Sequence, residues 1–99
     1  MKTLAEIKRL LKGQKQALAN EYGITDIGLF GSYVRAEQKP DSDLDILVTL
    51  EEPPFIDLFD LVRLQDELTK LLGVQVDVAL RHNLRKRIGK QILSEVVPI

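Results

Sequence analysis

Residues 24–50 read ITDIGLFGSYVRAEQKPDSDLDILVTL, and two apolar runs in this stretch flank a polar loop. The first run, 24–30, is short and partly β-branched, which predicts a strand that ends at Gly31. The second run, 43–50, alternates apolar and polar residues with the period of two that a strand requires. A single helical turn over 32–37 and a proline-containing loop are expected to join the two strands.

The remaining segments show helical spacing or a third alternating run. Apolar residues recur every three or four positions over 3–22 and 57–72, and again in the final segment, 83–97. Thr3 gives the segment 3–22 a capping pattern at its N-terminus. A glycine follows the C-terminal end of each of the segments 3–22 and 57–72. Val74, Val76, Val78 and Leu80 alternate over 74–80, which predicts the third strand.

This order of elements predicts an α/β (α+β) fold in one domain, residues 1–99. We expect a small mixed sheet of three to four strands, with helices packed on its apolar face. The strands at 43–50 and 74–80 are joined through a whole helix, so they are expected to be parallel neighbours with a right-handed crossover. The loop between the first two strands leaves their relative direction open.

The composition excludes several classes of protein. The chain has 99 residues, 44% of them apolar and 29% charged, with a net charge of -1. It has no cysteine and one histidine, which excludes a disulfide framework and a Cys/His metal site. Its apolar runs are too short to span a bilayer, so we expect a cytoplasmic protein without a membrane partner. Its few aromatic residues are not interleaved with basic ones, which argues against direct nucleic-acid binding.

Charge is distributed unevenly along the chain. Residues 41–67 contain nine acidic side chains and one basic side chain, whereas residues 81–90 contain five basic and no acidic ones. One interpretation is that these are solvated faces of helices. The other is that the basic end meets an acidic partner or the phosphates of a nucleotide.

Three aspartates are the candidate catalytic and metal-binding residues. Asp43 and Asp45 lie two apart on one strand, so their Cα atoms are about 6.6–6.8 Å apart on one face. Asp77 lies on the polar face of the next strand. Carboxylates about 5 Å apart repel by roughly 3 kcal/mol per pair at an effective dielectric near 20. An all-oxygen site of this kind favours Mg²⁺ or Mn²⁺, and two such ions suit phosphoryl transfer.

The Gly31-Ser32 turn is the candidate phosphate-binding element. It follows a strand and opens a helical turn, where backbone N–H groups favour an anion. Glycine lets the backbone approach a ligand closely, and Ser32 adds a hydroxyl. Arg35, one turn further on, is expected either to contact phosphate or to pair with a nearby aspartate.

These residues resemble the Gly-Ser-x10-Asp-x-Asp signature of the polymerase-beta-like nucleotidyltransferase superfamily, and in size the minimal nucleotidyltransferase (MNT) group. The resemblance covers nearly the whole chain and implies the nucleotidyltransferase fold. It implies that Gly31, Ser32 and Arg35 bind the nucleoside triphosphate, most commonly ATP. It also implies that Asp43, Asp45 and Asp77 hold two Mg²⁺ ions (or Mn²⁺), with Asp77 helping to activate the acceptor hydroxyl.

The resemblance further implies a partner and a biological role. MNT proteins are commonly encoded beside a HEPN-domain RNase toxin, and some transfer AMP to a tyrosine of that toxin and so act as antitoxins. We therefore expect a nucleotidyltransferase, a protein adenylyltransferase, that works in a hetero- or homo-oligomer, because the chain leaves no length for an added substrate domain. The alternatives are an idle antitoxin that neutralises its toxin by binding, and a transferase acting on a small molecule such as an aminoglycoside.

One residue departs from the family pattern. The family usually has glycine after the arginine, and here that position is Ala36. Alanine adopts a positive φ less readily than glycine. The departure therefore bears on the shape of the loop more than on the chemistry of the three carboxylates.

Overall fold

The structure, a computed structural model, describes residues 2–84 and 86–99, with only the backbone of Lys86 and Arg87. Its elements are, in order, α1 (Leu4–Tyr22), β1 (Ile24–Phe30), β2 (Leu44–Leu50), α2 (Leu58–Leu72), β3 (Val76–Leu80), the 3₁₀ turn η1 (Arg81–Asn83), α3 (Lys86–Glu95) and β4 (Val97–Pro98). Thr3 caps α1 through its side chain, and Asp57 forms a capping box with Asp60 at the start of α2.

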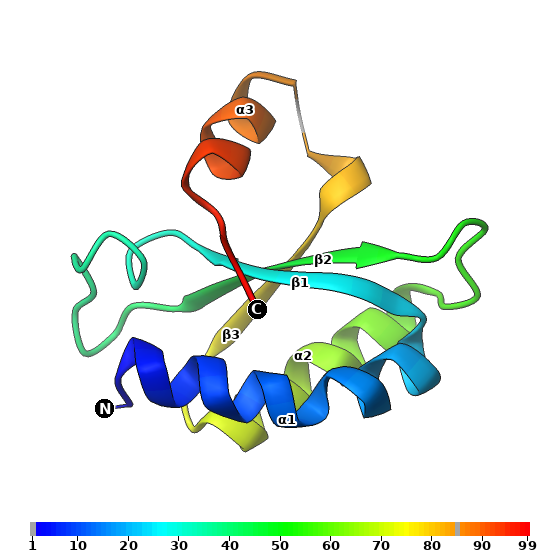
Figure 1. Ribbon diagram of the computed structural model, residues 1–99, viewed down its shortest axis with the longest axis horizontal. Helices are drawn as coiled ribbons and strands as arrows, with labels where there is room; N and C mark the ends of the chain where they lie inside the picture. Colours follow the sequence, from blue (N-terminus) through cyan, green and yellow to red (C-terminus); the bar gives the residue numbers. More distant parts are fainter. Residues whose placement is uncertain (1, 85) are drawn as a thin grey trace.

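The four strands form one mixed sheet in the order β3-β2-β1-β4. β1 is antiparallel to both β2 and β4, whereas β2 and β3 are parallel and are connected through α2. The prediction of a small mixed sheet with parallel second and third strands is confirmed, and the open direction of the first pair is antiparallel. In Figure 1, α1 and α2 lie together on one side of the sheet and α3 lies on the other side.

The hydrophobic core lies between the sheet and the helix pair α1 and α2. The alternation in β2 buries Leu44, Ile46, Val48 and Leu50, as the sequence pattern predicts. Leu47 is also buried, although it points to the opposite face from these four residues. The face that carries Asp45 is therefore partly covered, which reduces the access of water to it.

The helical spacing over 57–72 predicts one apolar stripe, and of its members Leu68 and Leu72 are buried while Leu61 and Leu71 pack against the core. Leu58 and Val62 fit a helical repeat with Leu61 and Leu68, but they are 78% and 69% exposed. The buried residues of this helix are Leu64, Leu68 and Leu72. α2 is rich enough in leucine to present two overlapping stripes, and packing against α1 and the sheet selects one of them.

The C-terminal segment differs from the single helix predicted over 83–97. The chain forms η1, then α3, and ends in the short strand β4, which pairs with β1 at Gly28 and Leu29. Pro98, expected as a helix stop, lies within this strand at the edge of the sheet, where a residue without an N–H is tolerated. Within the basic segment 81–90, Arg85 and the side chains of Lys86 and Arg87 lie outside the described part of the chain.

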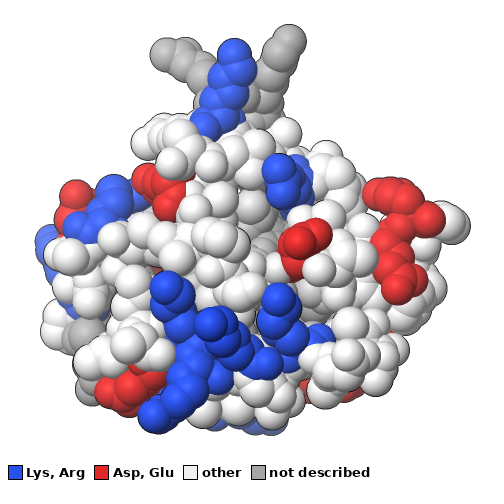
Figure 2. Space-filling view, viewed as in Figure 1, with Lys and Arg blue, Asp and Glu red and all other residues white. Residues whose placement is uncertain are grey.

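The face that Figure 2 shows carries groups of like charge, although acidic and basic side chains also lie next to each other at its left. Lysine and arginine side chains gather over α1, which carries Lys8, Arg9, Lys12 and Lys15, and acidic side chains gather at the turn after β2.

Among residues 2–84 and 86–99, the structure contains no helix that combines the length and the apolar character needed to cross a membrane.

The free edge of the sheet at β3 is closed by side chains from α2. The outward N–H of Val76 donates to Thr69 Oγ1 at 3.1 Å, and that of Val78 donates to Gln65 Oε1 at 3.1 Å. Exposed edge N–H groups invite pairing with another chain, and these bonds occupy them. They also fix α2 along β3, the strand that carries Asp77.

We predict that Thr69→Val lowers the free energy of unfolding by roughly 1–3 kcal/mol, because it leaves the partly buried Val76 N–H without an acceptor. Thr69→Ser keeps the hydroxyl and is the matched control. Urea denaturation of the two variants measures the difference. Equal stability of the valine and serine variants would show that this bond does not hold α2 to the edge.

Candidate active site

The Gly-Ser turn begins where β1 ends and brings its backbone against β2. Gly31 is buried and has a φ of 83°, in the left-handed region that favours glycine. A Cβ atom at this position would lie 3.0 Å from Cγ of Asp45 and still closer to the carboxylate oxygen Oδ2. Glycine is therefore required here by both the backbone conformation and the space, and the turn touches the central aspartate directly.

The rest of the segment forms one helical turn, as the sequence predicts. The N–H groups of Val34 and Arg35 donate to the Gly31 carbonyl at 3.1 Å, and that of Glu37 donates to the Ser32 carbonyl at 2.9 Å. This helical turn ends at Ala36, whose φ is 58°. Ala36 thus adopts the left-handed conformation that the family's usual glycine would adopt, at a cost of about 1–2 kcal/mol for an L-residue.

The strand register brings the aspartates to one end of the sheet. Asp45 pairs with Phe30 on β1 and with Asp77 on β3, so it lies between the end of the Gly31 strand and the third carboxylate. Directly paired residues project from the same face. Asp43 immediately precedes β2, two residues from Asp45. All six residues predicted for the site therefore lie on or beside three neighbouring segments: the turn after β1, the start of β2 and the start of β3.

The surroundings of Asp45 shift the pKa of its carboxyl. Asp45 is partly buried, whereas Asp43 and Asp77 are exposed. Burial raises the pKa of the Asp45 carboxyl above its usual value, and the neighbouring charges of Asp77 and Asp43 raise it further. The direction of this shift means that the folded chain holds the negative charge of Asp45 at a cost in free energy, which a cation would reduce.

No three metal-binding side chains stand close enough to share one ion as they are placed in residues 2–84 and 86–99. The donor chemistry nevertheless fits a divalent cation. All three candidate ligands are carboxylates, and the two outer ones are exposed and can change rotamer toward Asp45. Burial raises the pKa of Asp45 most, the charges of Asp77 and Asp43 raise it further, and the charge of Arg35 lowers it.

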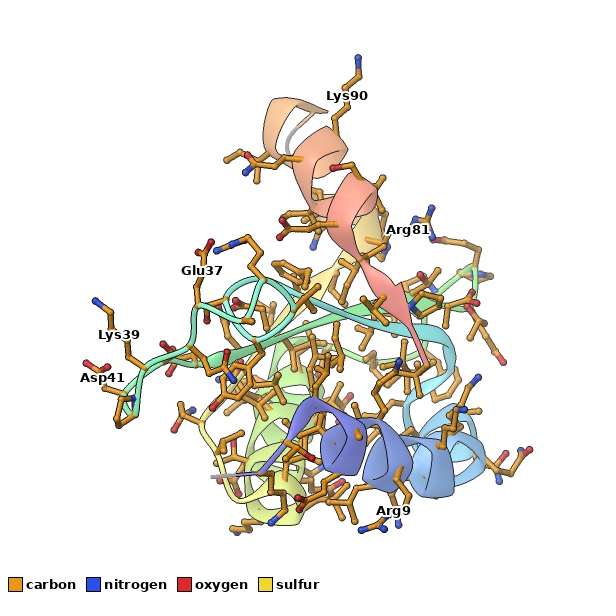
Figure 3. All side chains as sticks on the ribbon, turned by 60° about the vertical axis from the view of Figure 1, so that its left-hand side comes forward. Arg9, Glu37, Lys39, Asp41, Arg81 and Lys90 are labelled. Carbon is orange, nitrogen blue, oxygen red and sulfur yellow. The ribbon has the colours of Figure 1, made fainter. Side chains whose placement is uncertain are left out.

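Arg35 pairs with glutamates, and the alternative of pairing with a nearby aspartate is wrong for the structure described here. Its Nε donates to Glu37 Oε2 at 3.2 Å, and its Nη1 donates to Glu95 Oε1 at 3.0 Å. Figure 3 shows Glu37 at the turn, on the side toward α3, whereas Lys39 and Asp41 lie at the outer tip of the loop that follows.

Glu95 is a residue of the site that the sequence analysis did not identify. It is the last residue of α3, and its carboxylate accepts from both Arg35 and the Gly31 N–H. It lies 64 residues from Gly31 in the chain. A lone glutamate in an amphipathic helix gives no sequence signal of such a contact, because the contact depends on where β4 places the end of α3.

We predict opposite effects of two substitutions at the ends of the turn. Ala36→Gly raises the free energy of unfolding by about 0.5–1 kcal/mol, because glycine adopts a positive φ without strain. Gly31→Ala lowers it by more than about 1 kcal/mol, because its φ is also positive and the new Cβ meets Asp45. Chemical denaturation measures both, and a destabilising Ala36→Gly would contradict the geometry of the turn.

Comparison with known proteins identifies the family of this chain. A family model described as "Nucleotidyltransferase domain" matches residues 11–99. A relative named "Protein adenylyltransferase MntA", from Thermococcus cleftensis, is 45% identical over 97 residues, which cover 98% of this chain and 96% of the relative. A solved structure named as a minimal nucleotidyltransferase has a TM-score of 0.82 and 35% identity, and the match covers 99% of this chain and 97% of that one.

A more distant structure shares the fold. It is a complex of a tri-AMPylated HEPN toxin of Shewanella oneidensis with an MNT antitoxin, and it matches with a TM-score of 0.68 at 19% identity, over 93% of this chain and 70% of that one. The family match and the relatives that cover nearly the whole chain point to one family. The chain belongs to the nucleotidyltransferase domain family and is a homologue of MntA-type protein adenylyltransferases.

Proposed function

We propose that this chain transfers AMP from ATP to a hydroxyl group of a protein partner. The observation that carries the proposal is the β2–β3 register, which sets Asp77 beside Asp45 at the end of the sheet where the Gly31 turn also lies. Acidic side chains at this point suit phosphoryl chemistry, and the turn offers backbone N–H groups to an anion. The relative from Thermococcus cleftensis, named a protein adenylyltransferase, supports a protein acceptor.

The reaction follows from the arrangement of groups. The acceptor oxygen forms a bond to the α-phosphorus of ATP, the bond from that phosphorus to the bridging oxygen of the pyrophosphate breaks, and pyrophosphate leaves. Asp77 is an exposed residue of the edge strand β3, where its carboxylate takes the proton of the acceptor hydroxyl. Gly31, Ser32 and Arg35 bind and orient the triphosphate. Most of the rate then comes from positioning and from neutralisation of charge.

Asp43, Asp45 and Asp77 would hold two Mg²⁺ ions, or Mn²⁺, which neutralise the triphosphate and polarise the phosphorus. The three carboxylates supply negative charge for these ions, and the raised pKa of Asp45 is consistent with a site built to receive a cation. ATP and Mg²⁺ are both abundant in the cytoplasm, where we place this activity.

We propose that the acceptor is a tyrosine of a HEPN-domain toxin and that its modification neutralises the toxin. The MNT chain of the Shewanella oneidensis complex, which shares the fold, is bound to an AMPylated HEPN toxin, and this supports the partner. The proposal also fits the surface of the chain. Leu58, Phe59 and Val62 are 78%, 85% and 69% exposed on α2, and apolar side chains of this size are commonly buried in a protein complex.

The same exposed face favours a second candidate function, neutralisation by contact alone. Leu58, Phe59 and Val62 come after the C-terminal end of β2. Asp43 and Asp45 lie at its N-terminal end. A chain with an idle site could still bind a partner through them. Neutralisation of the toxin in cells by an Asp43→Ala, Asp45→Ala double variant, at the level of the wild type, would support binding without catalysis.

The catalytic proposal predicts label transfer from ATP to the partner. With Mg²⁺, ATP labelled at the α-phosphate and the HEPN toxin proposed as its partner, the wild type is expected to label the partner. Asp45→Asn and Asp77→Asn each lower the rate about 100-fold or more, because each removes charge that the transition state requires.

The matched control is Asp26→Asn. Asp26 is exposed on β1 and pairs with Thr49, so it shares the face of Asp45 at the other end of the strands. This variant is expected to keep the wild-type rate. Label on the partner that persists at the wild-type rate in Asp45→Asn would overturn the proposal, and so would the absence of label with the wild type.

A further inference from the structure

The carboxylate of Glu95 bonds to two of the groups that the Gly-Ser turn offers to an anion. Glu95 Oε1 accepts from the Gly31 N–H at 3.1 Å and from Arg35 Nη1 at 3.0 Å, and Oε2 lies 3.3 Å from the same Nη1. Its side chain is only 20% exposed, compared with 64% for Glu37, the other partner of Arg35. A carboxylate and a phosphate present similar oxygens to N–H donors and to arginine.

We propose that Glu95 is the group that a phosphate of the nucleotide replaces at Gly31 and Arg35, and that Glu95 therefore sets the affinity of the site for ATP. This inference rests on the proposed function, since it assumes that the turn binds the triphosphate. The Gly31 N–H has a single hydrogen, so it donates a strong bond to one anion at a time. Two anions at this turn would also repel each other, and Asp45 already lies beside it.

The segment that carries Glu95 is attached to the rest of the fold by few contacts. β4 contains two residues, and they pair only with Gly28 and Leu29 of β1. Beyond this pairing, the Ile99 N–H donates to the Ile27 carbonyl at 2.9 Å, and Lys15 Nζ donates to the Ile99 carbonyl at 3.0 Å. Figure 3 shows Lys90 extending from α3 away from the sheet. The described residues after Val76 contribute no buried hydrophobic side chain to the core between the sheet and α1 and α2, although Ile99 packs against it, so release of Glu95 leaves that core in place.

A stabilising role of Glu95 would give the opposite result from the proposed one. If Glu95 only held Arg35 and the turn in the shape that binds phosphate, its removal would weaken ATP binding. If phosphate replaces Glu95, its removal strengthens ATP binding even though the chain without nucleotide loses an ion pair. The direction of the change in affinity therefore separates the two roles.

The test is ATP binding in the presence of Mg²⁺, measured by calorimetry on the whole chain. We expect Glu95→Gln and Glu95→Ala to bind ATP about 5- to 10-fold more tightly than the wild type, because the competing carboxylate is gone. The matched control is Glu37→Gln, which removes the other carboxylate on Arg35 without affecting the Gly31 N–H. This variant is expected to bind ATP with an affinity within about twofold of the wild type, since exposed ion pairs contribute little to the free energy.

Hydrogen exchange supplies a second readout. Addition of ATP and Mg²⁺ to the wild type is expected to speed amide exchange over residues 88–99 and to leave the exchange of α1 unchanged. Binding of ATP by the wild type, with equal or weaker binding by both Glu95 variants, would overturn the role of Glu95 and leave the proposed function standing. Failure of all the variants to bind ATP would overturn both.

Discussion

The parallel register between β2 and β3 is the constraint on which the rest of the structure depends. In this register Leu44 faces Val76 and Asp45 faces Asp77, so one pairing sets both the core and the site. Leu44 and Val76 are buried on the side of α1 and α2, and a slip of one residue would move either strand's apolar set to the opposite face. The hydrophobic effect therefore fixes the position of two carboxylates that repel each other. The side chains of Gln65 and Thr69 reinforce the register by holding α2 along the outer edge of β3.

Much of this arrangement could be predicted from local patterns. The alternation over residues 44–50 and 76–80 fixes which side chains face the core, and the Gly31-Ser32 turn follows directly from the end of the first strand. The predicted site residues lie on segments that the sheet places side by side. Their roles in binding metal and nucleotide remain proposals, because they depend on ligands and not on backbone pattern.

The predictions that failed depend on contacts between distant parts of the chain. The pattern of α2 allows Leu58 or Leu64 to face inward, and only packing against α1 and the sheet selects Leu64. At the C-terminus, residues 83–97 have helical spacing, but Val97 pairs with Leu29, far away in the sequence. That same pairing carries Glu95 to Gly31. Such contacts are invisible to any pattern read within a few residues.

The turn between β1 and β2 combines strain with charge. Gly31 is required by the carboxylate of Asp45 beside it, whereas Ala36 adopts a positive φ that glycine would adopt more easily. The contacts of the turn hold Ala36 in this conformation, so the departure from the family pattern leaves the shape of the turn in place. Backbone strain of this kind is commonly found where a loop must present groups to a ligand. Glu95 adds an internal anion at the same place.

The binding of Mn²⁺ in the presence of a non-hydrolysable ATP analogue, followed by electron paramagnetic resonance, tests whether the strand register builds the metal site. If the register of β2 and β3 builds one shared site, the wild type binds two Mn²⁺ ions, and Asp77→Asn loses one of them or binds it at least about 10-fold more weakly. Asp26→Asn, on the same face of the sheet, retains both. Unchanged number and affinity of Mn²⁺ ions in Asp77→Asn would contradict the account.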